Sequence, residues 1–418
     1  GHLSHGAGVV IRRRNASLGA GGASSAVAQD SPREVSIWHY WGDTGTNAET
    51  VARYKELWEA SQDECTLNIR SIPTADFKRE LSTAILAGNT PDIAVIDNPD
   101  FAMFAAQGVL AELDERIEEW GEADAYYDGP WSSTMWDGHN YGVPVGSNPL
   151  ALFINNALAE EAGLDVSNPP QTWDDLMEWA AALTNPDNNQ YGITLIAERN
   201  ETATFMWLPF LQQTGEDIVS LDSDGGRAAL QLWVDLVENG YASPEIVNYG
   251  FGDIPGQFMA GNAAMMINGP WVINSLEAEA PDLEYTVAGL PYPENGQPAN
   301  GLGGENFSIF ANSDVQDCAW DFITFTQSPE NIVDWYAGLG FLPSRDLPEE
   351  QTTFWTEDPN MAVFLEQMQY ARARGPLPNW PEVSEVIQLM LQEALTGQAS
   401  VDDAISNAGA QISAMLGG

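Results

Sequence analysis

Polar and aromatic side chains follow two predicted strands near the start of the chain. The first set comprises Trp41, Asp43 and Thr44, and the second begins with Asp97 and Asn98. Strand and helix patterns alternate here with short connections, which is typical of a parallel doubly wound sheet, and ligands bind at the carboxyl ends of its strands. An aspartate in either set would alone be better explained as a helix cap. Two sets at one sheet edge, one of them carrying Trp41, favour contact with a ligand.

A third aromatic candidate ends the stretch from Phe258 to Trp271. Gly261 can take a positive φ and end a helix there, and the apolar run 263–267 is short and bounded by helix breakers, which predicts a buried strand. An Asn-Gly-Pro turn then follows the strand and is expected to project Trp271 outward. Taken alone, one tryptophan is better interpreted as a core residue.

Two capping boxes are predicted to open helices. The first pairs Thr46 with Glu49, and the second pairs Thr172 with Asp175. In the second helix Trp173 falls on the apolar face, so we expect it to pack in the core and not to belong to a site.

The charge of the chain excludes several classes of partner. It has 418 residues, with 61 acidic and 15 basic side chains and a formal net charge of -46; only Lys55 and Lys78 are lysines. Such a surface repels nucleic acid and anionic membranes. It also repels itself unless salt screens it, so we hypothesise a halophilic, high-salt habitat. No run of 18 apolar residues occurs, so we expect no membrane span.

The two cysteines leave two interpretations open. Cys318 shares a helical face with Ala319 and Phe322, which favours a buried free thiol. A disulfide between Cys65 and Cys318 is the alternative.

Residues 1–32 are expected to be a leader or a linker. An arginine triplet precedes a small-residue stretch that ends in an A-x-A pattern, as in a secretory signal. The stretch has almost no large apolar residues, which suits a twin-arginine signal better than a general one, and a disordered linker remains the alternative. His2 and His5 are expected to be tail residues and not metal ligands.

Enzyme motifs are absent from the sequence. There is no GxSxG, HExxH or CxxC pattern and no Walker loop, and only His39 and His139 lie outside the leader. A histidine-based triad or zinc site is therefore not expected, and we predict no cofactor, no metal and no catalytic residues. Glu305, directly before a predicted buried strand, is the most suggestive carboxylate, because a solvated face explains it poorly.

Several stretches, in order along the chain, resemble the family 1 extracellular solute-binding proteins, the sugar-binding components of ABC importers. The resemblance is carried by these segments: 141–156, Pro169–Leu176, Phe258–Trp271, Gly301–Phe310 and Gly340–Arg345. It implies an α/β fold of two doubly wound lobes joined by a multi-strand hinge, as in type II periplasmic binding proteins. The implied lobes are 33–146 with 308–337, and 147–307 with 338–418.

The resemblance also implies further ligand-binding residues on the crossings between the lobes. Ser147 would lie at the interlobe floor. Trp207 lies in a very apolar predicted helix, so from the residues alone it is either core or pocket wall. The remaining candidates implied at the later crossings and the last helices are Gly304, Glu305, Asn306, Phe341, Arg345 and Trp380.

The function implied is that of an extracellular or cell-surface receptor. It would bind a neutral sugar or oligosaccharide, act as a monomer and dock on the transmembrane subunits of an ABC permease. A non-sugar compatible solute in the same fold is one alternative. A glycoside hydrolase is another, because aromatic and carboxylate side chains also build such sites.

Overall fold

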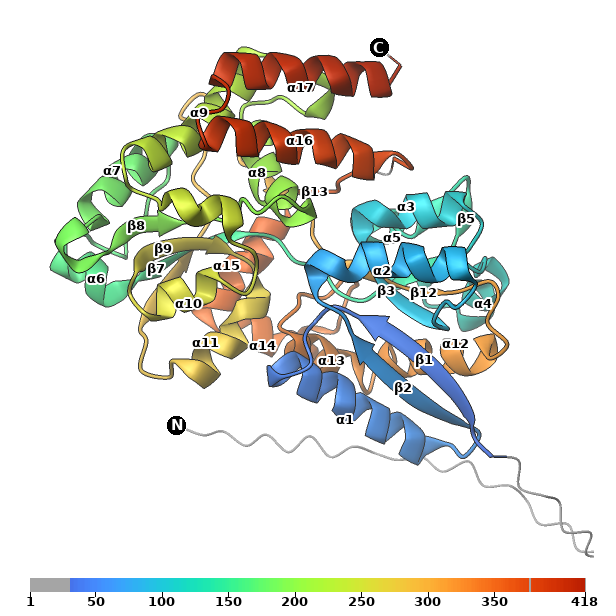
Figure 1. Ribbon diagram of the computed structural model, residues 1–418. Helices are drawn as coiled ribbons and strands as arrows, with labels where there is room; N and C mark the ends of the chain where they lie inside the picture. The colour runs from blue at the N-terminus through green and yellow to red at the C-terminus, as the bar shows by residue number, and fades with distance from the viewer. Residues whose placement is uncertain (1–30, 376, 418) are drawn as a thin grey trace, which may run out of the picture.

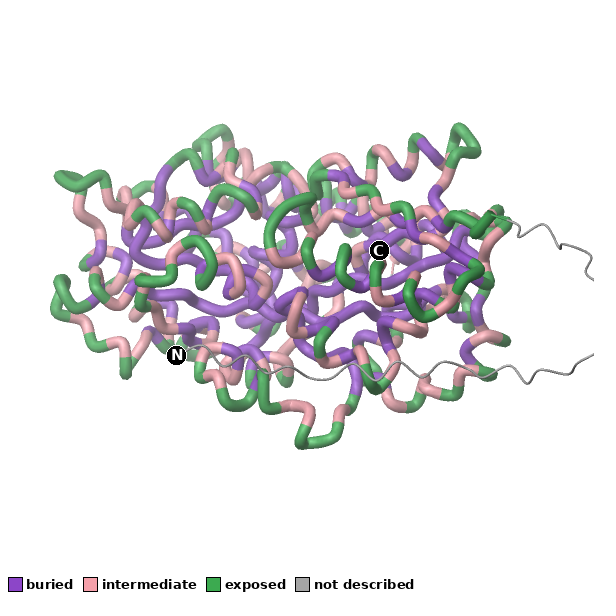
Figure 2. The backbone as a smooth tube through the Cα atoms, turned by 90° about the horizontal axis from the view of Figure 1, so that it is seen from below, coloured by how far each residue is buried: buried purple, intermediate pink, exposed green. Residues whose placement is uncertain are grey.

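The computed structural model describes residues 31–375 and 377–417. The predicted leader lies almost wholly outside the described residues. The rest folds into two α/β lobes side by side (Figure 1), and buried segments run through the middle of both (Figure 2).

The first lobe is built on a five-stranded sheet in the order β2-β1-β3-β12-β6. Strands β1 (Arg33–His39), β2 (Cys65–Ser71) and β3 (Ile93–Asp97) are parallel, as the sequence predicts. Strand β12 (Glu305–Ile309) enters antiparallel to β3, and β6 (Gly142–Pro144) is antiparallel to β12. The carboxyl ends of β1 and β3 therefore share an edge with the start of β12.

Helices cover both faces of this sheet (Figure 1) and turn apolar residues inward against it. Their bounds are α1 Gly45–Ser61, α2 Thr74–Ala87, α3 Asn98–Ala106, α4 Asp114–Trp120, α5 Asp128–Ser132, α12 Gln316–Thr326 and α13 Ile332–Leu339, with a small hairpin of β4 Met135–Trp136 and β5 His139–Asn140.

The second lobe has a four-stranded sheet in the order β10-β7-β9-β8. Strands β8 (Tyr191–Thr194) and β9 (Ala263–Asn268) are parallel, whereas β7 (Ala151–Asn155) and β10 (Tyr285–Ala288) are antiparallel to their neighbours. Every residue of β9 is buried, as predicted for 263–267.

The helices of this lobe include two long ones at the end of the chain that pack on α8 and α9 (Figure 1). Their bounds are α6 Asn156–Glu161, α7 Trp173–Leu183, α8 Glu201–Gln213, α9 Asp224–Glu238, α10 Ile254–Met259, α11 Ile273–Glu279, α14 Thr353–Thr356, α15 Pro359–Met368, α16 Trp380–Leu395 and α17 Val401–Met415, with a short pair of β11 Asn300–Gly301 and β13 Ala371–Arg372.

The chain crosses between the sheets three times, and the crossing segments contact one another. Single backbone bridges join Ser147 to Leu342 and Asn148 to Gly303. Gly304 has a φ of 140°, and a Cβ there would lie 2.4 Å from the carbonyl oxygen of Gly146, so only glycine fits this close crossing. The two-lobed α/β fold with a multi-strand hinge is confirmed, and the lobe boundaries given above remain a proposal.

Two local predictions are wrong. Helix α1 begins at Gly45 with Thr44 at its N-cap and no capping hydrogen bond, so Thr46 lies inside the first turn and forms no capping box. The cysteines are not free thiols: Cys65 and Cys318 form a disulfide, because the start of β2 and the start of α12 lie together. The second capping box, Thr172 with Asp175, is confirmed.

Among the described residues, no helix is both long and apolar enough to cross a membrane.

Candidate functional site

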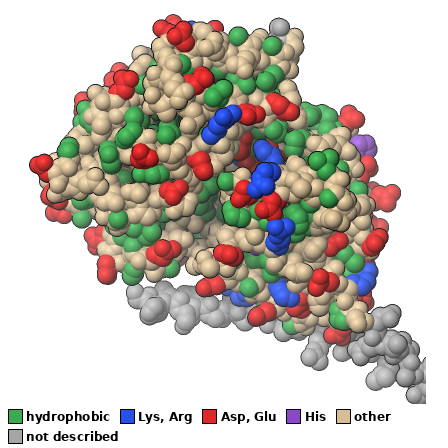
Figure 3. All heavy atoms as spheres, in the orientation of Figure 1, with side chains coloured by type: hydrophobic (Ala, Val, Ile, Leu, Met, Phe, Trp, Pro, Cys, Tyr) green, Lys and Arg blue, Asp and Glu red, His purple; other side chains and the backbone are tan. Residues whose placement is uncertain are grey.

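A cavity of about 790 Å³ lies between the lobes. The first lobe contributes the carboxyl ends of β1 and β3 and the first turns of α2 and α3, and the second lobe contributes α8, α10, α11 and α16. The crossing segments complete its lining. Figure 3 shows a hollow between the two lobes, with Lys, Arg, Asp and Glu side chains gathered beside it. We call this cavity the interlobe cleft.

The structure brings six of the predicted site residues together in this cleft. Those six are Trp41, Asp97, Trp271, Gly304, Glu305 and Phe341.

Trp271 is positioned by the turn that follows β9. A Cβ on Gly269 would lie 1.9 Å from the ring of Trp271, so the glycine lets the indole fold back against the backbone. The ring packs edge-on against Phe251, with centroids 5.3 Å apart, and lies 6.5 Å from Phe205. Three aromatic rings of the second lobe thus form one wall of the cleft.

Trp41 lies on the first-lobe side of the cleft, and neighbouring rings pack against its indole. Its ring stacks on His39 at 5.3 Å and meets Phe341 edge-on at 5.9 Å. The backbone N–H of Trp41 donates to Nδ1 of His39, and burial lowers the pKa of His39 to about 4. The imidazole is therefore neutral at pH 7 and serves as packing and as an acceptor.

A buried arginine connects the two walls. Arg374 donates two hydrogen bonds to Asp97 of the first lobe, at 3.0 and 3.2 Å, and one to Glu201 of the second lobe, at 2.7 Å. Its guanidinium lies 4.5 Å from the ring centroid of Phe205, and its side chain is only 3% exposed. Burial raises the pKa of Asp97, and Arg374 opposes that shift. Asp97 thus presents a carboxylate whose orientation is fixed.

The other cation of the cleft is also paired. Lys78 lies 3.1 Å from Asp100, at the first turn of α3. Burial raises the pKa of Asp100 to about 6, against the pull of Lys78. Burial disfavours the charged lysine, but Asp100, Glu201 and Asp97 together raise its pKa.

The carboxyl group of Glu305 is strongly perturbed by its burial in the cleft. Burial, followed by the nearby charge of Asp97, raises the pKa of Glu305 to about 8, while Tyr40 and Trp41 lower it. The Oε2 atom of Glu305 is buried without a hydrogen-bond partner. At pH 7 this group is a carboxylic acid that can donate as well as accept.

Unpaired buried polar atoms concentrate around the cleft. Among the described residues that line the cleft, the following buried atoms have no hydrogen-bond partner: Trp41 Nε1, Asn47 Oδ1, Asn148 Oδ1, Glu201 Oε2, Glu305 Oε2 and Arg374 Nε. Buried polar groups are normally hydrogen-bonded, so such a concentration marks a place where a polar ligand or a lobe movement supplies partners.

Two predicted tryptophans are buried against other parts of the protein and do not line the cleft. Trp207 is fully buried, and its Nε1 donates to the carbonyl of Ala229, because α8 turns this face towards α9. Trp380 is 1% exposed, and its Nε1 donates to Glu201 at 3.0 Å. It therefore fixes the carboxylate that also holds Arg374 and offers no platform to a ligand.

Three buried polar residues from the predicted set bind protein groups instead of lining the cleft. The hydroxyl of Ser147 pairs with that of Ser344 at 2.9 Å. Asn306 donates to Ser133, whose hydroxyl lies 3.4 Å from Asn98. All three side chains are buried, and their hydrogen bonds join Ser147 and Asn306 of the crossings to neighbouring segments.

The last three predicted residues lie outside the cleft. Asp43 and Thr44 are exposed, because the loop before α1 turns away after Trp41. Arg345 donates to Glu122 at 2.6 Å and lies over the ring of Tyr126, in a different part of the hinge.

Sequence reasoning missed the cations and the second aromatic pair. Arg374 lies in a Pro- and Gly-rich loop, and no local sequence pattern reveals where that loop lies in space. The scarcity of arginine in this chain is the one signal that could have indicated a functional role for it. Phe205 belongs to an ordinary apolar run and Phe251 to a Gly-rich stretch before α10, and only their packing around Trp271 identifies them.

One group outside the cleft has ligand atoms spaced closely enough for a metal ion. The atoms of Glu112, Asp114 and His139 lie within 4.8 Å of one another. His139 is exposed and pairs with Asp114 at 2.7 Å, which raises the pKa of His139. We assign this surface group no ligand.

Comparison with known proteins identifies the type of molecule that carries this cleft. Residues 49–363 match the model of the bacterial extracellular solute-binding proteins. A putative binding protein of Brucella abortus is 27% identical over 98% of this chain and 100% of its own length. A maltotriose-binding protein of Pyrococcus abyssi is 25% identical over 78% of this chain and 70% of its own.

Two solved structures are similar over almost the whole chain. An ABC transporter solute-binding protein from Thermotoga lettingae, bound with alpha-D-tagatose, has 27% identity and a TM-score of 0.85, covering 92% of this chain and 100% of its own. The cyclic alpha-maltosyl-1,6-maltose binding protein of Arthrobacter globiformis has 32% identity and a TM-score of 0.74, covering 92% and 99%.

Proposed function

This chain belongs to the bacterial extracellular solute-binding proteins, and we propose that it binds a neutral sugar or oligosaccharide in the interlobe cleft for delivery to an ABC importer. The observation that carries the proposal is the pairing of Trp41 and Trp271 with the carboxyl groups of Asp97 and Glu305 around one cavity.

Each half of that pairing suits one side of a sugar. The C–H faces of a pyranose ring pack on the indole rings, and its hydroxyls donate to carboxylate oxygens. Arg374 contributes by holding Asp97 in one orientation, so the acceptor is arranged before the cargo arrives. Glu305, as a neutral acid, can donate to a ring or hydroxyl oxygen of the cargo.

The charges of the cleft support a neutral cargo. Seven acidic residues line it, against two basic ones, Lys78 and Arg374. Both cations already pair with carboxylates. An anionic cargo would meet net repulsion and, among the described residues that line the cleft, no unpaired cation.

The crossings support binding by lobe closure. Two lobes connected by short extended segments can rotate about them and enclose a solute, and the bridges at Ser147 and Asn148 place the segments side by side. The Arg374–Asp97 pair joins the lobes across the cleft in this arrangement.

The family sets the wider context of the proposal. We infer that the chain acts outside the cytoplasm as a monomeric receptor without enzymatic activity, and that it presents both lobes to the transmembrane subunits of a permease. A compatible solute is the alternative cargo, because such a solute also carries no net negative charge.

Calorimetric titration of the purified chain in molar salt tests the proposal, with a panel of mono- and oligosaccharides, polyols and betaine-like solutes. The expected result is saturable binding of one neutral saccharide, lost in Trp271→Ala, with no product formed on prolonged incubation. Binding of an osmolyte alone would replace the cargo class. Hydrolysis of a glycan would show that the chain is an enzyme and overturn the proposal.

A further inference from the structure

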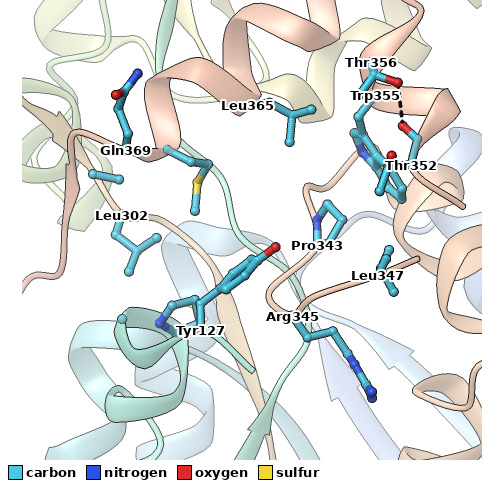
Figure 4. A pocket seen from close by; sticks show the side chains of 14 residues that line it. Tyr127, Leu302, Pro343, Arg345, Leu347, Thr352, Trp355, Thr356, Leu365 and Gln369 are labelled. Atoms are coloured by element: carbon cyan, nitrogen blue, oxygen red, sulfur yellow. Dashed lines mark hydrogen bonds between the residues drawn. The ribbon is translucent and has the colours of Figure 1, made fainter. Parts of the chain in front are cut away.

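A second cavity, of about 490 Å³, lies beside the crossing segments (Figure 4). Tyr127, at the start of α5 in the first lobe, forms one wall and is 42% exposed. Leu365 and Met368 of α15, which packs on the second sheet, form the opposite wall. Leu302 and Pro343 from the crossings also line it. The cavity, which we call the hinge cavity, falls within the size range of small-molecule sites, about 300–1,000 Å³.

The hinge cavity and the interlobe cleft lie on two sides of the same segments. Leu302 lines the hinge cavity, whereas the next residue, Gly303, lines the cleft. Successive residues of an extended segment face opposite sides, so this crossing forms a thin wall between the two cavities. The third crossing also contributes to both, with Phe341 in the lining of the cleft and Pro343 in that of the hinge cavity. A rotation about that wall changes both cavities at once.

The lining of the hinge cavity favours an uncharged ligand. Among the described residues, Arg345 is its one charged lining residue. The guanidinium of Arg345 donates to Glu122 through Nη2, lies over the ring of Tyr126, and points away from the cavity in Figure 4, while its Nε and Nη1 atoms are buried without a partner. The remaining lining is mostly apolar, with the aromatic rings of Tyr127 and Trp355. This contrasts with the seven carboxyl groups of the cleft.

Three polar side chains of the hinge cavity, those of Thr352, Thr356 and Gln369, leave acceptor atoms for a ligand that donates a hydrogen bond. The hydroxyl of Thr352 donates to the carbonyl of Glu349 at 2.8 Å, and that of Thr356 donates to the carbonyl of Thr352 at 3.2 Å. The side-chain amide of Gln369 likewise donates to the carbonyl of Glu366. With these donors engaged, the hydroxyl and amide oxygens keep acceptor capacity for an O–H or N–H of a ligand.

We propose that the hinge cavity binds a small, uncharged aromatic molecule with one hydrogen-bond donor, and that its occupation stabilises the present lobe arrangement. The second half follows because the walls belong to different lobes. A molecule that touches Tyr127 and Met368 together loses one wall when the lobes rotate, so it binds this arrangement more tightly than others.

The arrangement so stabilised has Arg374 joined to Asp97 across the cleft. Because Asp97 has here the orientation that we propose for cargo binding, occupation of the hinge cavity raises the affinity of the cleft for its cargo, and the cargo raises the affinity of the hinge cavity by the same factor. This coupling rests on the proposed function, whereas the site itself does not.

Indole, uncharged and with a single N–H, is the probe that tests the site. Its binding to the full chain is measured in molar salt by calorimetry and by ligand-observed saturation-transfer NMR, with benzoate as an anionic comparison. We expect saturable binding of indole and none of benzoate. Met368→Trp fills the cavity and should abolish binding, and Tyr127→Ala should weaken it by about two- to tenfold through loss of an aromatic contact.

Met415→Trp is the matched control, because Met415 is exposed at the end of α17 and does not line the cavity. The control should bind indole like the unaltered chain. Absence of saturable indole binding overturns the site, and so does binding that Met368→Trp and Tyr127→Ala both leave unchanged.

The coupling is read by titrating the cargo identified above with and without saturating indole. We expect a severalfold rise in cargo affinity, absent in Met368→Trp. Indole binding with unchanged cargo affinity overturns the coupling and keeps the site. If indole binds and no saccharide or solute does, the site stands while the proposed function and the coupling fall together.

Discussion

Replacing Arg374 with methionine is expected to destabilise the fold and weaken cargo binding. The substitution keeps an apolar stem against Phe205 but removes three hydrogen bonds and the charge that Asp97 and Glu201 share. Breaking a buried ion pair from one side costs about 3–5 kcal/mol, because the remaining charge stays buried without a partner. The side chains of Asp97 and Glu201 are 25% and 14% exposed, so water solvates the unpaired carboxylates in part and reduces the cost. We therefore expect a loss of stability at the lower limit, about 3 kcal/mol.

The assay is calorimetric melting in molar salt. An unfolding entropy of roughly 2.1 cal/mol/K per residue over this chain converts 3 kcal/mol into a fall of about 3–4 °C, if the lobes unfold together. Arg372→Met is the matched control, because Arg372 is exposed two residues away and its removal makes the same change in net charge. Arg374→Lys keeps the charge without the two-pronged geometry and should fall between the two.

The result that would refute the reasoning is a melting temperature of Arg374→Met equal to that of Arg372→Met. It would mean that the two carboxyl groups become neutral or hydrated at no cost, and that the pair contributes nothing to the fold. A loss of stability with unchanged cargo affinity would keep the structural role and remove the orienting role of Arg374.

Four further results are expected. Trp271→Ala should weaken cargo binding about tenfold by calorimetry, whereas Trp179→Ala, on α7 and outside the cleft, should not. Burial raises the pKa of Glu305 to about 8, so between pH 4.5, its ordinary pKa, and pH 8 the folded chain holds a proton that the unfolded chain has released. The stability from this proton is full below pH 4.5 and is lost as the pH rises to about 8, so the melting temperature should fall across this window. Glu305→Gln should remove that fall, and an unchanged slope would contradict the prediction. The melting temperature should rise from low to molar salt, as a net charge of -46 requires if self-repulsion is significant, and a flat response would end the halophilic hypothesis. Replacing Cys65 and Cys318 together by serine should cost about 2–4 kcal/mol in denaturant unfolding and abolish any effect of reductant.

Local signals predicted those parts of the fold that depend on local physics. The parallel strands β1, β2 and β3 follow from apolar runs separated by helical periodicity, and the buried strand β9 follows from its breakers. Trp41 and Asp97 could be placed at the cleft because the carboxyl ends of parallel strands meet at one edge.

The remainder of the site depends on distant segments. Trp207 and Trp380 have the residue type of a sugar platform, but helix packing against α9 and hydrogen bonding to Glu201 bury them. The partner of Asp97, Arg374, is 277 positions away. The disulfide follows the same pattern, since its cysteines are 253 residues apart. Such contacts depend on how the lobes cross, which no local periodicity encodes.

The pairing of both cleft cations determines what the cleft can recognise. Arg374 and Lys78 direct their charge at Asp97, Glu201 and Asp100, so they hold acceptors in place and leave no free cation for a cargo anion. The cleft therefore presents oriented acceptors and aromatic faces, and the ligand that satisfies both carries several hydroxyl donors on an apolar ring. Hydrogen bonding then discriminates between cargoes. A cargo that lacks one hydroxyl leaves a buried carboxyl oxygen unpaired, and this costs more binding free energy than the missing contact alone. Affinity should accordingly depend on the number and orientation of hydroxyls and fall when the cargo gains a negative charge.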